Sequence, residues 1–481
     1  MACWARSPCG LAHIDASEKQ RMIDLIINRN SWSDGERGDI LDYCASDVIA
    51  LEALLLAMAS NIDWPRALLR GRYMAAAVAR MHRAGVPIDI ELLERLRARW
   101  SAIQREVIWR IDDLNFNVYE GTTFKQWRFE RCLALANIPW PRTPSGRLSI
   151  DADTFAEQVA QHVEFEQLME LRSVLGAMRL KDLEVGADGR NRCYLAPLRS
   201  LTGRNQPSSS RFIFSAAKWM RSLVRPPEGW GVSYIDFSAQ EIGIAAAMSG
   251  DERMIEAYAS GDPYLAFAIA AGLAPIGATK ETHREIRDRC KGVVLGTLFG
   301  MGADGLAAKI SVTSCEAEEL LRLHRQTYKP FWRWIEGMVD SAMLTNQIMT
   351  VFGWRRQLSW DPEGRPPNAR SLMNFPMQAN GAEMMRIAAI AGTEAGIEVC
   401  APVHDAFLIA APLERLDNDV RHMQELMTRA GNAVTGGLDI RTEAKIFKWP
   451  DRYFDEEAVK MWDQIIGVLD RLDGYNERRS R

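Results

Sequence analysis

Two acidic residues stand out because each lies in a short apolar segment of the kind that forms a strand. Asp405 belongs to Ala-Pro-Val-His-Asp-Ala-Phe-Leu-Ile at 401–409, which predicts two short strands joined by a tight turn. Asp236 lies in Ser-Tyr-Ile-Asp-Phe-Ser at 233–238, a second predicted strand. A predicted helix between them carries Arg287 and Lys291. Two carboxylates and a cationic helix are the parts that metal-dependent phosphoryl transfer requires.

Each of these parts also has a plainer interpretation. Asp favours turns because its side chain bonds to nearby backbone, and an Asp at a strand end commonly caps the next helix. Arg287, Lys291, Leu295 and Phe299 follow one another at intervals of four and so share one helix face. That face runs from cations to apolar groups, which matches the polarity of a nucleoside triphosphate. The alternative is an amphipathic helix with two solvated cations.

The 481-residue chain is long enough for several structural units, and its formal net charge of -4 does not call for a polyanionic partner. A run of basic residues with no acidic residue is more informative. It consists of Arg190, Arg192, Arg199, Arg204, Arg211, Lys218, Arg221 and Arg225. The run is either a solvated basic face or a track for nucleic acid, since neutralised phosphates supply most non-specific affinity.

The 8 cysteines are scattered and include no CxxC pair, which argues against a structural zinc and indicates reduced thiols. The N-terminus lacks the pattern of a signal peptide, and no apolar run is long enough to span a bilayer. We therefore expect a cytoplasmic protein without a membrane partner.

Periodicity predicts the elements that must position the acidic and basic residues. Helices are expected at about 35–59 and 90–114, and again up to about 185. A turn at 226–229 leads into the Asp236 strand, followed by helices over about 239–344. A hairpin at 350–356 and a helix at about 367–395 precede the His404-Asp405 turn.

Five motifs, in this order, resemble those of the family-A DNA polymerases, the group of bacterial DNA polymerase I and many phage replicases. Thr-Gly-Arg at 202–204 is followed by Asp-Phe-Ser-Ala-Gln-Glu at 236–241, which is similar to the family's Asp-Tyr-Ser-Gln-x-Glu. Residues 287–300 are similar to its Arg-x3-Lys-x2-Asn-Phe-Gly-x2-Tyr-Gly. The last two are Arg-x3-Asn-x3-Gln at 370–378 and Val-His-Asp at 403–405. The resemblance covers roughly residues 60–450.

The resemblance implies a role for each matching residue. Asp236 and Asp405 would hold two Mg²⁺ ions, with Mn²⁺ as a substitute, and Lys291 would join them in catalysis. Glu241 would be the steric filter against ribonucleotides. The incoming dNTP would be bound by Arg287, Lys291, Leu295 and Phe299.

The same resemblance implies a set of residues that contact the primer-template DNA: Arg204, Arg370, Asn374, Gln378 and His404. Acceptors in the minor groove are nearly independent of sequence, which suits an enzyme that copies any template. For His404 the alternative is a hairpin residue that bonds only to nearby backbone.

The implied fold is α+β: a right hand with a thumb, helical fingers and a palm built on an antiparallel sheet. The expected boundaries are 1–60 for a helical exonuclease fragment, 61–185 for the thumb and connecting helices, 186–250 for the first part of the palm, 251–345 for the fingers and 346–481 for the rest of the palm.

The chain departs from the family pattern at several positions. Ala406 stands where many members have a Glu that is dispensable for metal binding. Leu295 replaces an aromatic residue that stacks on the nucleotide, and Phe299 replaces a Tyr whose hydroxyl pairs with the filter Glu. Glu241 must therefore find another partner or stay hydrated. The sequence explains neither of two further replacements, Val294 for Asn and Gly243 for Arg.

Near the N-terminus, Tyr-Cys-Ala-Ser-Asp at 43–47 resembles the Tyr-x3-Asp motif of the 3′–5′ proofreading exonuclease fused to these polymerases. There Asp47 would bind metal and Tyr43 would orient the attacking water. The Asp-x-Glu at 34–36 lies in a polar stretch that predicts a helix start, not a strand. We expect the last helices of an exonuclease without its main active site. Either the gene is truncated or split, or a separate chain supplies the rest. A packing role alone is the favoured alternative.

Together these features predict a DNA-directed DNA polymerase of replication or repair, without proofreading in this chain, near the nucleoid of a bacterial or phage-infected cell. Two other classes stay open. A single-subunit RNA polymerase shares the architecture and both carboxylates, although Glu241 argues against it. A non-catalytic DNA-binding relative of a polymerase would have no need of a metal pair.

Overall fold

The computed structural model describes residues 16–29, 31–113, 116–143, 145–159, 162–177, 180–360 and 367–479. The chain divides into two compact units, residues 1–71 and 72–481. Within the described ranges, no helix combines the length and apolar character that crossing a membrane requires. The cysteines there are free thiols, and Cys193, Cys290 and Cys400 among them are buried. Cys3 and Cys9 lie outside the described residues.

The first unit is helical. It contains α1 (Ala16–Ile27), α2 (Asp34–Met58) and most of α3 (Trp64–Arg72). Ser33 caps α2: its hydroxyl accepts from the N–H of Glu36, whose carboxylate accepts from the N–H of Ser33. The acidic pair at 34–36 is therefore a helix start, as predicted. The apolar side chains of Leu41, Val48, Leu51 and Leu55, at helical spacing along α2, are exposed.

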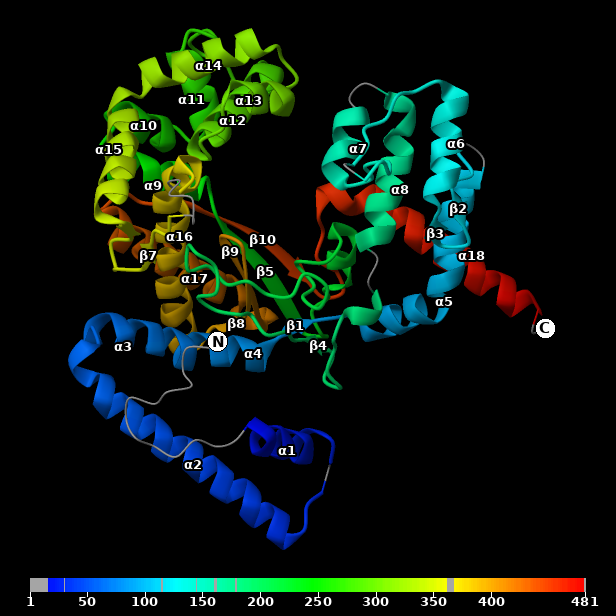
Figure 1. Cartoon of the computed structure of the whole chain (residues 1–481), viewed down its shortest axis with the longest axis vertical. Coiled ribbons are helices and arrows are strands. Elements are labelled where there is room, and N and C mark those ends of the chain that lie inside the picture. The colour runs from blue at the N-terminus through cyan, green and yellow to red at the C-terminus, as the bar shows by residue number, and fades with distance from the viewer. Residues whose placement is uncertain are drawn as a thin grey trace. The chain divides into compact units, whose positions relative to one another are not determined.

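An antiparallel sheet forms the centre of the second unit, and its strands lie in the order β10-β5-β9-β8. The strands are β5 (Trp230–Phe237), β8 (Glu398–Val403), β9 (Ala406–Pro412) and β10 (Thr442–Lys448). The helices α16 (Ala369–Glu394) and α17 (Leu413–Thr435) pack against the sheet, and α9 (Gln240–Ser249) packs against both of them (Figure 1). β9 is buried along nearly its whole length, so its apolar run is continuous and does not alternate.

Six helices between the two halves of the sheet form the group predicted as fingers (green to yellow in Figure 1). They are α10 (Glu252–Ala259), α11 (Pro263–Ala270), α12 (Arg284–Leu298), α13 (Ala303–Ile310), α14 (Ser314–Thr327) and α15 (Lys329–Thr345). Asp251 and Asp262 begin the first two by accepting a backbone N–H. The predicted hairpin follows as β6 (Gln347–Met349) and β7 (Arg355–Gln357).

The elements before the sheet correspond to the predicted thumb and its connections. They are α4 (Ala79–Ala84), β1 (Val86–Pro87), α5 (Ile90–Ile108), β2 (Tyr119–Glu120), β3 (Thr123–Phe124), α6 (Gln126–Ala136), α7 (Ala152–Val159), α8 (Glu166–Ala177) and β4 (Arg190–Asn191). Wider π turns precede α4 at Tyr73–Val78 and follow α5 at Trp109–Asp113, so the helix predicted to reach 114 is α-helical only to Ile108. The C-terminal α18 (Val459–Arg479) packs against α5, where Asp473 pairs with Arg95 at 2.9 Å.

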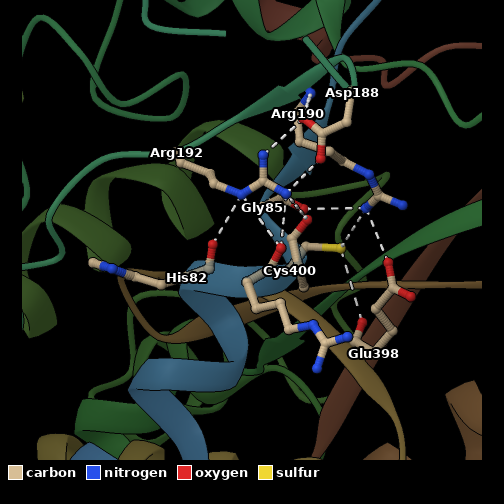
Figure 2. Close-up of polar contacts among 9 residues, drawn as sticks. His82, Gly85, Asp188, Arg190, Arg192, Glu398 and Cys400 are labelled. Atoms are coloured by element: carbon tan, nitrogen blue, oxygen red, sulfur yellow. Dashed lines mark hydrogen bonds and ion pairs between the residues drawn. The ribbon is translucent and has the colours of Figure 1, made fainter. Parts of the chain in front are cut away.

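Figure 2 shows how two arginines of the basic run fix the end of α4 and the strand β8. The Arg192 guanidinium donates to the last carbonyls of α4, and Asp188 accepts from it at 2.8 and 2.7 Å. A cation at a helix C-terminus is favourable because the exposed carbonyls there carry partial negative charge. Arg190 pairs with Glu398 of β8 at 2.9 Å. Because β8 runs directly into the His404-Asp405 turn, these contacts help to fix the strand that carries the turn.

Most of the basic run is paired with carboxylates inside the protein. Six of its members lie within ion-pair distance of one: Arg190 with Glu398, Arg192 with Asp188, Arg204 with Glu241, Arg211 with Glu184, Arg221 with Asp455 and Arg225 with Asp89. The pairs of Arg190, Arg221 and Arg225 are shielded and act as an internal scaffold, whereas the Arg211–Glu184 pair is exposed. Neither of the two interpretations left open therefore describes the run as a whole.

Candidate active site

Asp236 and Asp405 meet at one edge of the sheet, where β5 ends beside the β8–β9 turn. Asp236 lies opposite Ala406 of β9, and the N–H of Phe237 donates to the carbonyl of Asp405 at 3.2 Å. His404 and Asp405 form the turn itself, with His404 in the left-handed region at φ 55°. The structure thus brings together the two carboxylates that the sequence singled out.

The carboxylate of Asp236 is in an electrostatically unfavourable place. Its Oδ1 atom is buried and has no hydrogen-bond partner among the described residues. Burial, followed by the charge of Asp405, raises the pKa of Asp236 well above its usual range. Glu443, directly opposite on β10, raises this pKa further, and Lys445 lowers it. A cation beside the two carboxylates would remove the repulsion.

The oxygen ligands at this edge of the sheet fit Mg²⁺. This ion prefers oxygen and is usually held by one or two carboxylates together with substrate phosphates. Across the described part of the chain, no cluster of three or more acidic, His or Cys side chains could hold a metal. The orphaned Oδ1 of Asp236 is a protein ligand that a metal bound jointly with substrate would satisfy.

Glu241, in the first turn of α9, is paired with Arg204 from the loop that precedes β5. The Nη2–Oε1 distance is 3.5 Å, and the Glu241 side chain is only 16% exposed. Burial raises the pKa of Glu241, and the positive charge of Arg204 opposes that rise. The sequence left Glu241 without a partner because Phe299 has no hydroxyl. In the structure Arg204 is that partner.

Arg287 and Lys291 of α12 both approach the ring of Tyr264 at the start of α11. The Arg287 guanidinium lies 5.4 Å from the ring centre and the Lys291 ammonium 5.9 Å. Arg287 is also ion-paired with Asp262, the residue that caps α11, and with Asp288. Burial raises the pKa of Tyr264, and the charge of Asp405 adds to it. The ring therefore lies within electrostatic reach of the carboxylate site.

The two apolar residues predicted to contact a nucleotide base lie at the end of the same helix. Leu295 is half-buried on α12, and Phe299 follows the last helical residue with 41% of its surface exposed. The departures at Val294 and Gly243 have packing reasons. Val294 is buried inside the fingers. A Cβ at Gly243 would lie 2.5 Å from Ile440 and 3.1 Å from the ring of Tyr258, so a side chain does not fit.

The residues predicted to contact primer-template DNA differ in their exposure. Arg370 is exposed at the start of α16, and Gln378 is half-buried farther along it. Asn374 is buried and donates to the carbonyl of Leu298 at 3.3 Å, so its amide holds the end of α12. His404 is exposed and helps to line a cavity of about 120 Å³ together with Arg204.

The two residues of the exonuclease-like motif lie one turn apart on α2. The charge of Asp47 contributes to the raised pKa of Tyr43. No cluster of potential metal ligands accompanies them in the described ranges. Their assignment to an exonuclease stays a prediction from the sequence.

Four residues that shape this site were not singled out by the sequence. Asp262 and Tyr264 lie at the start of α11, within the stretch predicted only as helices, although Asp before Pro is a common helix start. Glu383 and Arg386 lie in the buried α16, where they form an ion pair at 2.8 Å. Two opposite charges three positions apart, in the otherwise uncharged stretch 371–393, were the available signal.

Known proteins resemble this chain over most of its length. The family model for DNA polymerase family A matches residues 92–448. A thermostable DNA polymerase I of Thermus thermophilus is 25% identical over 391 residues, covering 74% of this chain and 45% of the relative. The DNA polymerase of Mycobacterium phage D29 is 25% identical over 416 residues, covering 83% and 67%. The chain spans less than half the length of the two Thermus relatives, of which it covers 45% each.

Among solved structures, the polymerase domain of Pol1 from M. smegmatis, in complex with DNA primer-template and dNTP, has the same fold. The TM-score is 0.67 at 23% sequence identity, and the match covers 89% of this chain and 77% of that one. The expected right-hand α+β architecture is thereby confirmed.

Proposed function

This chain belongs to DNA polymerase family A, and we propose that it is a DNA-directed DNA polymerase that adds dNTPs to the 3′ end of a primer. The observation that carries the proposal is the meeting of Asp236 and Asp405 at the end of β5. The cations of α12, Arg287 and Lys291, both lie beside the ring of Tyr264 at the start of α11.

Asp236 and Asp405 are the proposed ligands of the divalent metal. When bound, two Mg²⁺ or Mn²⁺ ions would lower the pKa of the primer 3′-hydroxyl and neutralise charge on the triphosphate and the leaving pyrophosphate. The chain's own contribution is to hold both carboxylates in one place through the β5–β9 pairing, before any substrate arrives.

The nucleotide is proposed to bind between the fingers and the sheet. Arg287 can grip phosphate oxygens with two parallel hydrogen bonds, and Lys291 adds a compact positive charge. Leu295 and Phe299 offer the base an apolar surface. Glu241, held by Arg204, would lie against the sugar and exclude a 2′-hydroxyl.

For the primer-template, the proposed contacts are Arg204, Arg370, Gln378 and His404. Asn374 is proposed to contribute through the end of α12, to which it is bonded, or after releasing that bond. The cytoplasmic location, the association with the nucleoid and a separate chain that completes the exonuclease stay predictions from the sequence.

The test is extension of a labelled primer-template with Mg²⁺ by the wild-type chain and by Asp405→Asn. We expect extension to fall by about a thousandfold, the effect of losing ~4 kcal/mol of transition-state stabilisation. DNA affinity, measured by fluorescence anisotropy, should change little. Glu414→Gln is the matched control, because it removes an exposed carboxylate at the start of α17, beside the end of β5 that lies away from Asp236.

Parallel reactions with rNTPs separate the remaining classes. Preferential use of rNTPs would show that the chain acts as an RNA polymerase and not as a DNA polymerase. DNA binding without extension by either nucleotide would indicate a non-catalytic relative.

A further inference from the structure

The loop that carries Arg204 is tightly constrained. The N–H of Arg204 donates to the hydroxyl of Ser200 at 2.8 Å, and the N–H of Gly203 donates to the carbonyl of Ser200 at 2.9 Å. Gly203 has φ 72°, a conformation that a residue with a side chain rarely adopts. The direction in which Arg204 leaves the loop therefore depends on how the Gly203 backbone is held.

Two side chains from outside the loop hold that backbone. Arg386 of α16 donates through Nη1 to the carbonyl of Gly203 at 2.7 Å. The indole N–H of Trp354 donates to the carbonyl of Leu201 at 3.0 Å. Both also pack closely on the loop, since a Cβ at Gly203 would lie 2.9 Å from the Trp354 ring and 3.1 Å from Arg386.

Arg386 is itself fixed by a buried ion pair. It lies 2.8 Å from Glu383, and the two side chains are 2% and 0% exposed. The hydroxyl of Thr350 donates to Glu383 at 2.8 Å and accepts the N–H of Trp354 at 2.8 Å. One network thus joins α16, the β6–β7 hairpin and the loop.

A buried ion pair is not an efficient way to stabilise a core, because desolvation of both charges offsets their attraction. Apolar side chains of the same size could fill α16 at this place. They could not supply the N–H that the Gly203 carbonyl accepts. The ion pair therefore supplies a hydrogen bond to the loop that apolar packing would not. The same loop carries Arg204, whose guanidinium lies 3.5 Å from the carboxylate of Glu241.

We propose that Glu383, Arg386 and Trp354 are positioning residues for nucleotide selection: through Gly203 and Arg204 they hold Glu241 where it rejects a ribose. This rests on the proposed polymerase function and adds to it a relay that runs from the interior of α16 to the sugar. In a chain with Phe299 at the end of α12, the relay takes over the task of holding the Glu241 carboxylate.

The experiment measures single-nucleotide incorporation of matched dNTP and rNTP by wild type and by Trp354→Phe, Arg386→Lys and Glu383→Gln. The readout is the ratio of kcat/KM for the dNTP to kcat/KM for the rNTP. Both are measured on the same preparation, so the fraction of correctly folded enzyme cancels. We expect each variant to lower the ratio by about tenfold, the usual effect of losing one hydrogen bond to a constrained group. KM for the rNTP should fall relative to that for the dNTP.

Asp455→Asn is the control, because it breaks the Arg221–Asp455 ion pair, which is also shielded, is 3.0 Å long and shares no residue with the network. It should lower thermal stability without changing the ratio. If Arg386→Lys or Glu383→Gln fails to fold, Trp354→Phe still tests the relay, since it removes one N–H and keeps an aromatic ring.

A double-mutant comparison shows whether the effect passes through Glu241. In a Glu241→Ala background, Trp354→Phe should have no further effect on the ratio. An unchanged ratio in Trp354→Phe, or a loss of equal size in the Glu241→Ala background, overturns the relay. A wild-type chain that extends no primer instead overturns the proposed function, so the two failures are distinguishable.

Discussion

Asp236→Asn is expected to make the metal-free protein more stable while abolishing its chemistry. In the wild type a buried carboxylate with an unpartnered oxygen lies beside a second carboxylate. Asn has nearly the same shape, carries no charge, and can donate a hydrogen bond to Asp405. The substitution therefore replaces a repulsion by an attraction without leaving a cavity.

The size of the effect follows from the burial of the group. An unsatisfied buried polar atom costs about 1–3 kcal/mol, and more when it is charged. We expect Asp236→Asn to raise the free energy of unfolding in EDTA by about that amount. In a unit of this length such a gain raises Tm by only a few degrees, because the unfolding entropy is large. Primer extension should fall by about a thousandfold, as for Asp405→Asn.

Because the pKa of Asp236 is raised to about 8, the repulsion is present only at higher pH. The assay is therefore thermal unfolding in EDTA at about pH 9, where Asp236 is ionised, paired with primer extension in Mg²⁺. Glu414→Gln again serves as control: its carboxylate is exposed at the start of α17, so both readings should stay near wild type. A less stable Asp236→Asn protein in EDTA would refute the view that the carboxylates repel each other. Extension at the wild-type rate would refute the metal assignment.

Two further substitutions test the packing of the site and its nucleotide contact. Gly243→Ala should lower the free energy of unfolding by about 1–3 kcal/mol, measured by urea unfolding, because the new Cβ would lie 2.5 Å from Ile440; a neutral effect would show that α9 can move away. Arg287→Ala should raise KM for dNTP by about tenfold to a hundredfold through the loss of a phosphate contact, with DNA affinity unchanged; an unchanged KM would remove Arg287 from the nucleotide site.

The parts of the fold that the sequence predicted well are those set by local periodicity. The β5 and β9 strands, the helix α12 and the turn at His404-Asp405 each follow from apolar spacing over a few residues. The helix start at 34–36 was equally predictable, because a capping box is a local pattern. The position of Asp236 beside Asp405 could not be predicted from apolar spacing, because spacing does not show which strands pair. It was predicted from the order of the family motifs.

What the sequence could not predict are the partners of charged groups, because these join segments that are distant along the chain. Arg386 reaches a carbonyl 183 positions away, and nothing near Gly203 in the sequence signals that contact. The ion pairs of the basic run could not be predicted for the same reason. Its acidic partners, such as Glu398 and Asp455, come from other segments, so the run looked uncompensated when read by itself.

The charges of the site divide into two kinds, and the division explains how substrate could complete it. Two of the cations are already paired within the protein: Arg287 with Asp262 and Arg204 with Glu241. The two carboxylates at the end of β5 lack such partners, because Asp236 has no hydrogen bond to Oδ1 within the described residues and faces Asp405.

Under the proposed function, a bound metal would neutralise the two carboxylates, and the nucleotide phosphates would compete with Asp262 for Arg287. Phosphate binding would gain little at Arg287 itself, since it only exchanges one anion for another there. Nucleotide and metal would therefore bind more favourably together than either alone, which links occupation of the fingers to completion of the carboxylate site.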